Sequence, residues 1–588
     1  MRILLVHPED SLRSGPWLGQ NWDLVVDLGK SSAFIRDLSQ ERLKAPVLQL
    51  DSLRHTEDME LMRKIVGLGR DQLMDDAGLD WWVLVSVFAY APLGEAVMLR
   101  RLASQLGPAA ELYATRPGWP ASGVALILER PLRTFPDAGR PSIFHHYRGV
   151  LKRFSFDQLA EIFLDKYDPR YRWRRRFSGS RPERRGPVVL LPSAYTNVSQ
   201  MAVAYASMLP EQSFLVVATR RSGTYFAPAP NVACASLAAY ADGAESEAEY
   251  LRIVGQWEKL KQSFALFPEM NLLLRAGLLE RFTAHFRDGL AVRNAWRNVL
   301  SQEQVVAVMC GDDSNPSTRL PVMLARQQGI PTLDFHHGAM DGRFTLKELS
   351  SDLYLAKGEM ERDYLLRICG LPAERVVLGG PVRSRAVPAA EGKKDEDSVI
   401  IFFSEPYDSG GRRTEEVYQE LLPPLALLAR EHGRRLVVKL HPFESRHERM
   451  QLIGKVLSPA EAGWVDVVEG PFTPQLVAKA WFAITVESST VIDCALLGVT
   501  CFVCDWMNSS SYGYNHQYAR FGVGRPLNSR EQLKELPRLL TKPATQVSDD
   551  ALSKPLEPEW LRQIISNGGN AKASHMPGHE KAGAQNTE

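Results

Sequence analysis

The sequence predicts an α/β protein that consists of several domains, each with a parallel β-sheet. The chain has 588 residues, which is too long for a single domain of the usual size, about 150 residues. Hydrophobic residues make up 45% and charged residues 24%, so there is enough apolar side chain for several cores. Short apolar runs alternate with helical stretches along most of the chain, and this alternation is typical of parallel sheets.

The net charge and the cysteines exclude several classes of protein. Lys and Arg number 70 and Asp and Glu number 69, which gives a net charge of +1, so we expect no general attraction to nucleic acid. The 6 cysteines lie mostly in apolar runs, which indicates buried free thiols in a reducing compartment. Cys501 and Cys504 form a CxxC pair, but no second pair lies nearby. We therefore expect neither zinc nor redox chemistry at this pair. For the protein as a whole we predict no metal and no cofactor.

Residues 1–135 are expected to form an N-terminal α/β domain. Apolar runs at 3–6, 23–28 and 81–90, which take the places of strands, alternate with helical segments. The first run is too short for a secretory signal, and the run from Trp81 is shorter than the roughly 20 residues that span a bilayer. These features favour a cytoplasmic protein. No glycine-rich phosphate loop follows Val6, so the sequence assigns this domain no function.

Residues 136–186 are strongly basic, and eight arginines lie between Arg170 and Arg185. One interpretation is a linker whose charges are solvated or paired with nearby acids. The other is a peripheral contact with an anionic membrane, such as the inner membrane face, or with a polyanionic acceptor, because each basic residue at such a surface contributes about 1 kcal/mol. The tail, residues 566–588, lacks periodicity and is expected to be disordered.

Two further α/β domains are predicted, at 187–390 and 398–545. Strands of the first are expected in these segments: 187–191, 214–218, 305–309, 331–335, 352–356 and 376–378. Strands of the second are expected in these segments: 399–403, 436–440, 464–468, 482–486 and 500–504. In parallel sheets ligands bind beyond the carboxyl ends of the strands, so the polar residues that follow these strands are the candidates for a site.

The first such strand end is Asp334-Phe335-His336-His337-Gly338, and the segment continues to Arg343. Adjacent histidines of an extended chain point to opposite sides, so only one can face a ligand. We choose His337 as a general base for an acceptor hydroxyl, and Asp341 as the second candidate catalytic residue. The alternative is a histidine that only holds a loop in place.

The second strand end is Lys439-Leu440-His441-Pro442. Pro442 stops the strand and holds His441 at its end, where an imidazole N–H can bind a phosphate oxygen. A His-Pro dipeptide alone is weak evidence.

The third strand end is Glu487-Ser488-Ser489, which leads into a helix. Two hydroxyls next to unpaired backbone N–H groups can bind a diphosphate. The alternative is that this segment only starts the helix, because Thr490 and Asp493 have the spacing of a capping box.

The fourth strand end is Gly311-Asp312-Asp313-Ser314-Asn315. Its acids are suited to holding a metal or assisting a base, but no third ligand is visible at suitable spacing. A loop or N-cap role is therefore favoured.

In this order, the segments resemble nucleotide-dependent GT-B transferases that build bacterial surface polymers, in particular CDP-glycerol glycerophosphotransferases and capsule or polysialic-acid transferases. The resemblance covers about residues 300–510. It rests on His337-Gly338, on the elements 354–358 and 379–383, on Lys439 to Pro442, and on Ser488-Ser489 to Asp493.

The resemblance implies a cytoplasmic glycosyltransferase or glycerophosphotransferase of cell-envelope and capsule polysaccharide synthesis, with a GT-B-like pair of Rossmann-type domains. It implies a nucleotide-activated sugar or polyol donor and a glycan or lipid-linked acceptor. The candidate donor-phosphate contacts are His441, Ser488, Ser489, Lys439 and Arg383. The candidate nucleotide or sugar contacts are Glu487, Asp493, Gly380 and Pro442. Two alternatives stay open, a nucleotide-sugar 2-epimerase-like enzyme and a non-catalytic polysaccharide assembly subunit.

Overall fold

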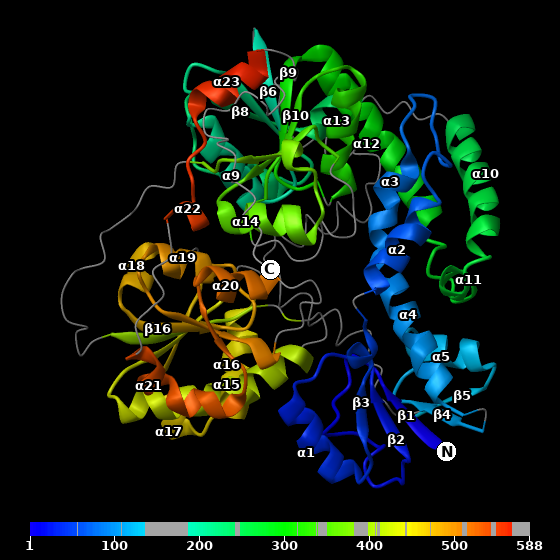
Figure 1. Ribbon diagram of the computed structural model, residues 1–588, viewed down its shortest axis with the longest axis vertical. Coiled ribbons are helices and arrows are strands. Elements are labelled where there is room, and N and C mark those ends of the chain that lie inside the picture. Colours follow the sequence, from blue (N-terminus) through cyan, green and yellow to red (C-terminus); the bar gives the residue numbers. More distant parts are fainter. Residues whose placement is uncertain are drawn as a thin grey trace, which may run out of the picture.

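The computed structural model describes residues 1–566 except the following positions: 56, 108, 136–185, 242–246, 314, 337, 339–349, 382–397, 406, 408–411, 442, 443, 471, 508–513 and 542–548. The predicted linker, apart from Gly186, and the predicted tail, apart from Ser566, therefore lie outside the described residues. The described chain contains three parallel sheets (Figure 1).

The N-terminal sheet has 5 strands in the order β3-β2-β1-β4-β5. Its strands are β1 (Arg2–Val6), β2 (Leu24–Asp27), β3 (Val47–Gln49), β4 (Glu111–Ala114) and β5 (Leu132–Thr134). The helices of this region are α1 (Ala33–Leu43), α2 (Asp58–Gly67), α3 (Trp81–Val85), α4 (Tyr90–Gln105) and α5 (Ala121–Leu128). The strand order reverses between β1 and β4, as in doubly wound sheets.

The middle sheet has 7 strands in the order β12-β11-β10-β9-β6-β7-β8. Its strands are β6 (Pro187–Ser193), β7 (Phe214–Ala218), β8 (Val232–Ser236), β9 (Gln304–Cys310), β10 (Thr332–Asp334), β11 (Leu353–Ala356) and β12 (Val376–Leu378). Its helices are α9 (Thr196–Ala206), α10 (Glu247–Phe264), α11 (Pro268–Arg275), α12 (Phe282–Gln302), α13 (Pro316–Gln327) and α14 (Glu359–Asp363). Here the order reverses between β6 and β9.

The C-terminal sheet has 6 strands in the order β15-β14-β13-β16-β17-β18. Its strands are β13 (Val399–Phe403), β14 (Leu436–Lys439), β15 (Val465–Val468), β16 (Ala480–Thr485), β17 (Cys501–Cys504) and β18 (Arg525–Leu527). Its helices are α15 (Arg412–Glu431), α16 (Arg446–Val456), α17 (Pro459–Ala462), α18 (Pro474–Ala478), α19 (Thr490–Leu496), α20 (Tyr514–Phe521) and α21 (Leu536–Leu540). The predicted fold class is thereby confirmed, since two parallel-sheet domains follow a further α/β domain.

The apolar run at 81–90 is not a strand, which corrects the sequence prediction. Trp81 starts the short helix α3, and the Asp80 side chain accepts a hydrogen bond from the Trp82 N–H as its N-cap. Trp81, Trp82 and Leu84 are all buried, so the run has no polar face. A short apolar run without periodicity does not distinguish a buried helix from a buried strand.

Helices α2 to α4 pack on the middle domain rather than only on the N-terminal sheet (Figure 1). The Trp82 ring lies 4.8 Å from Phe264 and 6.1 Å from Trp257, centroid to centroid. Leu93 of α4 belongs to the same core, whereas Leu99 of α4 packs under the N-terminal sheet. The N-terminal region and the middle domain thus share a continuous hydrophobic core.

No single described helix has the length and apolar character needed to cross a membrane. One bent pair, Trp81–Phe88 with Tyr90–Gln105, meets the requirement by length and composition only. Most side chains of α3 and half of those of α4 are buried in the cores described above.

The chain returns to the middle domain after the C-terminal sheet, beyond the predicted boundary at 545. Residues after α22 (Asp549–Leu552) pair with Gly380, whose N–H donates to the Lys554 carbonyl at 2.7 Å and whose carbonyl accepts from the Leu556 N–H at 2.8 Å. Helix α23 (Pro558–Ser566) then buries Leu561 and Ile564 in the middle core. The last described segment therefore joins the two domains.

We expect Gly358→Ala to loosen this return segment. A methyl group at Gly358 would lie 2.5 Å from the carbonyl oxygen of Ala551, and overpacking against backbone typically costs about 1–3 kcal/mol. Urea unfolding measures the loss. Gly454→Ala is the matched control, because nothing lies within 4 Å of the added methyl and alanine favours the interior of α16 by about 0.5–1 kcal/mol. Equal effects of the two substitutions would contradict the steric account.

Candidate functional site

The carboxyl edge of the C-terminal sheet brings together the residues that follow its central strands. Phe403 of β13 pairs with Lys439 of β14 on one side and with Thr485 of β16 on the other. The three strands therefore end at the same level. The strand order reverses between β13 and β16, and a reversal of this kind opens a crevice where ligands of parallel sheets bind.

Glu444 is the hub of this edge. Its side chain is 0% exposed and accepts from the Ser404 hydroxyl at 2.7 Å and from the His441 backbone N–H at 2.8 Å. Arg449 of α16 forms an ion pair with the same carboxylate at 2.7 Å, and the Ser404 hydroxyl also contacts the hydroxyl of Tyr418 on α15 at 2.7 Å. Glu444 thus fixes the residues after β13 and β14 relative to one another.

His441 is half-buried at this edge. Burial lowers the pKa of its imidazole, the nearby Lys439 ammonium also lowers it, and Glu444 opposes the shift. Since the usual pKa is about 6.5, a lowered value keeps the ring neutral at pH 7. A neutral imidazole has one N–H donor and no charge, so its strongest use here is a hydrogen bond to an anionic oxygen.

Lys439 is engaged elsewhere. Its buried ammonium donates to the Leu440 carbonyl at 2.8 Å and to the Gly470 carbonyl at 2.7 Å. Burial lowers its pKa. These contacts hold the end of β14 against the loop after β15, so we do not retain the predicted phosphate contact for this residue.

Ser488 and Ser489 differ in their surroundings. Ser488 is buried, its N–H donates to the Thr485 hydroxyl at 3.2 Å, and its own hydroxyl accepts from the Thr490 N–H at 3.4 Å. Ser489 is the residue before α19, and its side chain makes no capping hydrogen bond. Because α19 begins at Thr490 itself, Thr490 is not an N-cap and the proposed capping box with Asp493 is absent.

The charges of three carboxylates act on the Tyr407 phenol at this edge of the sheet. Burial raises the pKa of the Tyr407 phenol well above its usual value, and the charges of Glu405, Glu487 and Glu444 raise it further. Glu405 and Glu487 both lie two residues beyond the paired Phe403 and Thr485. Carboxylates accept hydrogen bonds but donate none, so this part of the edge suits the hydroxyl groups of a ligand rather than its phosphates.

Several predicted site residues lie elsewhere or outside the described residues. Gly380 is buried and its backbone binds the return segment, as described above, and Asp493 lies half-buried on α19. His337, Asp341, Arg383 and Pro442 fall in positions outside the described residues.

The strand end after β10 contains the neighbour of His337. His336 is 8% exposed and its Nδ1 accepts from the Gly338 N–H at 3.2 Å. The Gly338 carbonyl in turn accepts from the Lys357 ammonium at 2.7 Å. His336 is thus the histidine that holds the loop, and the choice of His337 as the base stays a prediction.

The fourth strand end has the favoured N-cap role. The Asn315 side chain accepts from the Ser317 N–H and caps α13. Asp313 is buried beside Arg319, whose guanidinium also donates to the Val83 carbonyl at 2.8 Å. The described residues contain no cluster of three His, Cys, Asp or Glu side chains that could hold a metal ion.

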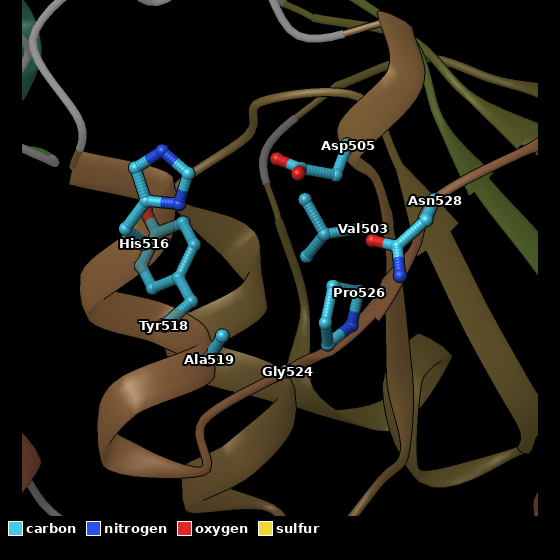
Figure 2. A pocket seen from close by; sticks show the side chains of 8 residues that line it. All are labelled: Val503, Asp505, His516, Tyr518, Ala519, Gly524, Pro526 and Asn528. Carbon is cyan, nitrogen blue, oxygen red and sulfur yellow. The ribbon is translucent and has the colours of Figure 1, made fainter.

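A pocket of about 180 Å³ extends this polar edge to β17 and β18. Figure 2 shows three polar side chains around it, Asp505 after β17, His516 on α20 and Asn528 after β18. Val503 and Pro526 form apolar walls. The carboxyl edge is therefore polar from β14 across to β18.

The sequence matches no protein-family model and no curated protein. Its solved structural neighbours include UDP-GlcNAc 2-epimerase from Methanocaldococcus jannaschii, at 10% identity over 65% of this chain and 100% of that chain, with a TM-score of 0.42. The glycotransferase of kitacinnamycin is 12% identical over 66% of this chain and 96% of that chain, with a TM-score of 0.37. A glycosyltransferase from Rickettsia africae is 10% identical over 65% of this chain and 93% of that chain, with a TM-score of 0.36. All three TM-scores lie below 0.5, and the fold of this chain is defined by its own three parallel sheets.

Proposed function

We propose that the protein is a transferase that moves a sugar or polyol phosphate from a nucleotide-activated donor to a hydroxyl of a glycan or lipid-linked acceptor. The observation that carries this proposal is the common level at which β14, β13 and β16 end. It groups His441, Ser489 and Glu487 at one reversal of strand order, where parallel sheets bind their ligands.

The donor phosphates would lie against His441 and Ser489. The imidazole, which is neutral at pH 7 in the free protein, and the serine hydroxyl each offer at least one donor, and the hydrogen bond from the His441 backbone to Glu444 holds the imidazole at the strand end. Donors that are fixed before the reaction stabilise the charge that develops on the leaving phosphate, and this is often the largest contribution to catalysis.

The hydroxyl-bearing part of the donor would lie against Glu487 and Glu405. Their carboxylates follow the ends of β16 and β13, raise the pKa of the Tyr407 phenol and offer acceptors for ribose or sugar hydroxyls. The negative charges of Glu405 and Glu487 disfavour a phosphate at the same position. The edge is thus divided into a phosphate half near His441 and a hydroxyl half near Glu487.

His337, with Asp341 in the same segment, is the proposed general base. It would take the proton of the acceptor hydroxyl as that oxygen bonds to the transferred group and the bond to the nucleotide phosphate breaks, a role worth about 10²- to 10⁴-fold. The basic segment from Arg170 to Arg185 would bring the protein to an anionic membrane that carries the acceptor.

Product analysis tests this function against the alternatives. The full chain is incubated with a panel of nucleotide sugars, CDP-glycerol and CMP-sugars, with and without glycan acceptors, and the nucleotide products are separated. A transferase releases nucleotide only when an acceptor is present, and His337→Ala abolishes this release. Conversion of one nucleotide sugar into its 2-epimer without acceptor would contradict the transferase and indicate a 2-epimerase. Binding of glycan without any donor turnover would indicate the assembly subunit.

Donor binding is expected to take up a proton at His441. Burial places the pKa of this imidazole below its usual value in the free protein, and a phosphate beside the ring favours the imidazolium and raises that pKa. Between the two pKa values the affinity should therefore increase as the pH falls, by up to about tenfold per pH unit. Below the pKa of the free protein it should level off.

Calorimetry in buffers of different ionisation enthalpy measures this proton uptake directly. A nucleotide sugar is the right ligand, because its phosphodiester groups do not titrate near neutral pH. His441→Gln keeps a hydrogen-bond donor and cannot be protonated, so it should remove the uptake. An uptake that persists in this variant would place the titrating group elsewhere.

A further inference from the structure

We infer that the N-terminal domain is a brace between the other two domains. It is fixed to the middle domain and held to the C-terminal domain by a polar contact, which we call the latch. The latch positions the carboxyl edge of the C-terminal sheet. This inference concerns the conformation of the chain and does not depend on the identity of the ligand. It rests on a difference between the two sides of the N-terminal region.

The side toward the middle domain is mainly apolar and includes one buried ion-pair network. Helices α2 to α4 share a core with α10 and α12, in which Trp82, Trp257 and Phe282 pack ring against ring. Arg293 of α12 also binds the buried Asp75 carboxylate at 2.7 Å. Separating these elements would expose a continuous hydrophobic core, so we treat them as one body.

The side toward the C-terminal domain is polar. The Ser31 hydroxyl donates to Glu416 at 3.1 Å and the Ser32 hydroxyl donates to Glu420 at 2.5 Å. At the rim, the Arg13 guanidinium donates to the Gln419 side chain at 2.9 Å. In the described chain, no buried hydrophobic cluster contains side chains from both the N-terminal sheet and the C-terminal domain.

The latch occupies the edge where a doubly wound sheet would bind a ligand. Ser31 and Ser32 lie in the connection from β2 to α1, at the carboxyl edge of the N-terminal sheet, and Ser32 is the N-cap of α1. Helix α15 of the C-terminal domain takes that place with Glu416 and Glu420, which are both buried. The N-terminal domain, whose sequence has no phosphate loop, thus binds α15 at this edge.

Helix α15 transmits the latch to the site. The Glu420 carboxylate accepts a hydrogen bond from the Ser32 hydroxyl and a second one from the Trp506 indole N–H, at 2.5 Å. Trp506 is the residue after Asp505, which lines the pocket. The Arg413 guanidinium donates to the Met507 carbonyl in the same segment. On the same helix, Tyr418 contacts Ser404, which binds Glu444. Helix α15 thus contacts the N-terminal domain, the segment after β17 and the segment after β13.

The coupling between latch and site is reciprocal, because a contact that changes ligand affinity is itself changed by the ligand to the same extent. Closing the latch should favour donor binding, and donor binding should favour the latched state. Couplings between sites commonly amount to about 5- to 150-fold in affinity.

Ser31→Ala/Ser32→Ala tests the latch in the full chain. Hydrogen exchange should become faster in α15 and in residues 501–507 and stay unchanged in α10 to α12, and small-angle scattering should show a larger radius of gyration. Ser52→Ala/Ser104→Ala is the matched control, since both serines are exposed in the same region and should leave all values unchanged. Glu420→Gln keeps the shape of this side chain and should give the same exchange pattern more weakly. It covers the case in which the double variant is poorly folded.

Unchanged exchange in α15 and 501–507 in both variants would overturn the latch. Faster exchange with unaltered affinity for a ligand that the wild type binds would overturn the coupling to the site, for which we expect a loss of about tenfold. If the wild type binds no nucleotide, the proposed function fails, while the exchange result still decides the latch.

Discussion

Arg293→Met should lower the free energy of unfolding by about 3–5 kcal/mol, because it leaves two buried carboxylates without their cation. The Arg293 side chain is 3% exposed and pairs with Asp75 and Glu249, which are 0% and 6% exposed. Its guanidinium contacts Glu249 through both carboxylate oxygens, at 2.6 and 2.9 Å. Chemical unfolding followed by tryptophan fluorescence measures the loss, since Trp81 donates to Asp75 and reports on this cluster.

The neighbouring Arg252 provides a matched control. It pairs with Asp76 and lies 3.9 Å from the same Glu249, but its side chain is 41% exposed. An exposed ion pair of this kind contributes about 0–1 kcal/mol, so Arg252→Met should have little effect. Similar losses for the two substitutions would show that burial does not determine the value of this network.

Glu444→Ala is the second substitution with a large expected effect. It removes the acceptor of Ser404, of the His441 backbone and of Arg449. Since the Arg449 side chain is 12% exposed, an almost buried cation loses its partner, and we expect a loss of about 3–5 kcal/mol. The segment with His441 also loses its fixed position, so nucleotide affinity should fall more than tenfold.

Unfolding of the variant and nucleotide titration below its transition measure the two effects separately. Glu469→Ala is the control, because this exposed carboxylate accepts only from the Arg446 N–H in the described contacts, at 3.2 Å. A Glu444→Ala protein of normal stability and affinity would show that the hub does not organise the site.

Local patterns in the sequence predict most strands, including the edge strand β12, but they miss the short strands β3, β5 and β18. The segments 376–378 and 399–403 are strands with the predicted bounds, because each is a short apolar run between polar or charged segments. The edge strands β3, β5 and β18 have three residues each and only one or two apolar positions that differ from a loop. At 81–90 a buried helix has the same composition as a buried strand, so the sequence prediction was wrong there.

The candidate site divides in the same way. His441 and Glu487 could be predicted because they follow strands of a parallel sheet, which is a local property. The roles of Glu444 and Lys439 could not, because Glu444 binds Ser404 at a separation of 40 residues and Lys439 binds Gly470 at a separation of 31. The spacing of Glu444 three residues after His441 was the available signal. The latch on α15 involves pairs 385 and 388 residues apart and has no local signal.

Nucleotide binding tests the central claim most directly. CMP, CDP, UDP, GDP and ADP are titrated into the wild type, His441→Ala, Ser488→Ala/Ser489→Ala and the control His447→Ala, which changes an exposed histidine of α16. We predict that one nucleotide binds the wild type and the His447 variant and is lost from the other two. Binding that survives in His441→Ala, or no binding of any nucleotide at millimolar concentration, would contradict a donor site at the carboxyl edge of the C-terminal sheet.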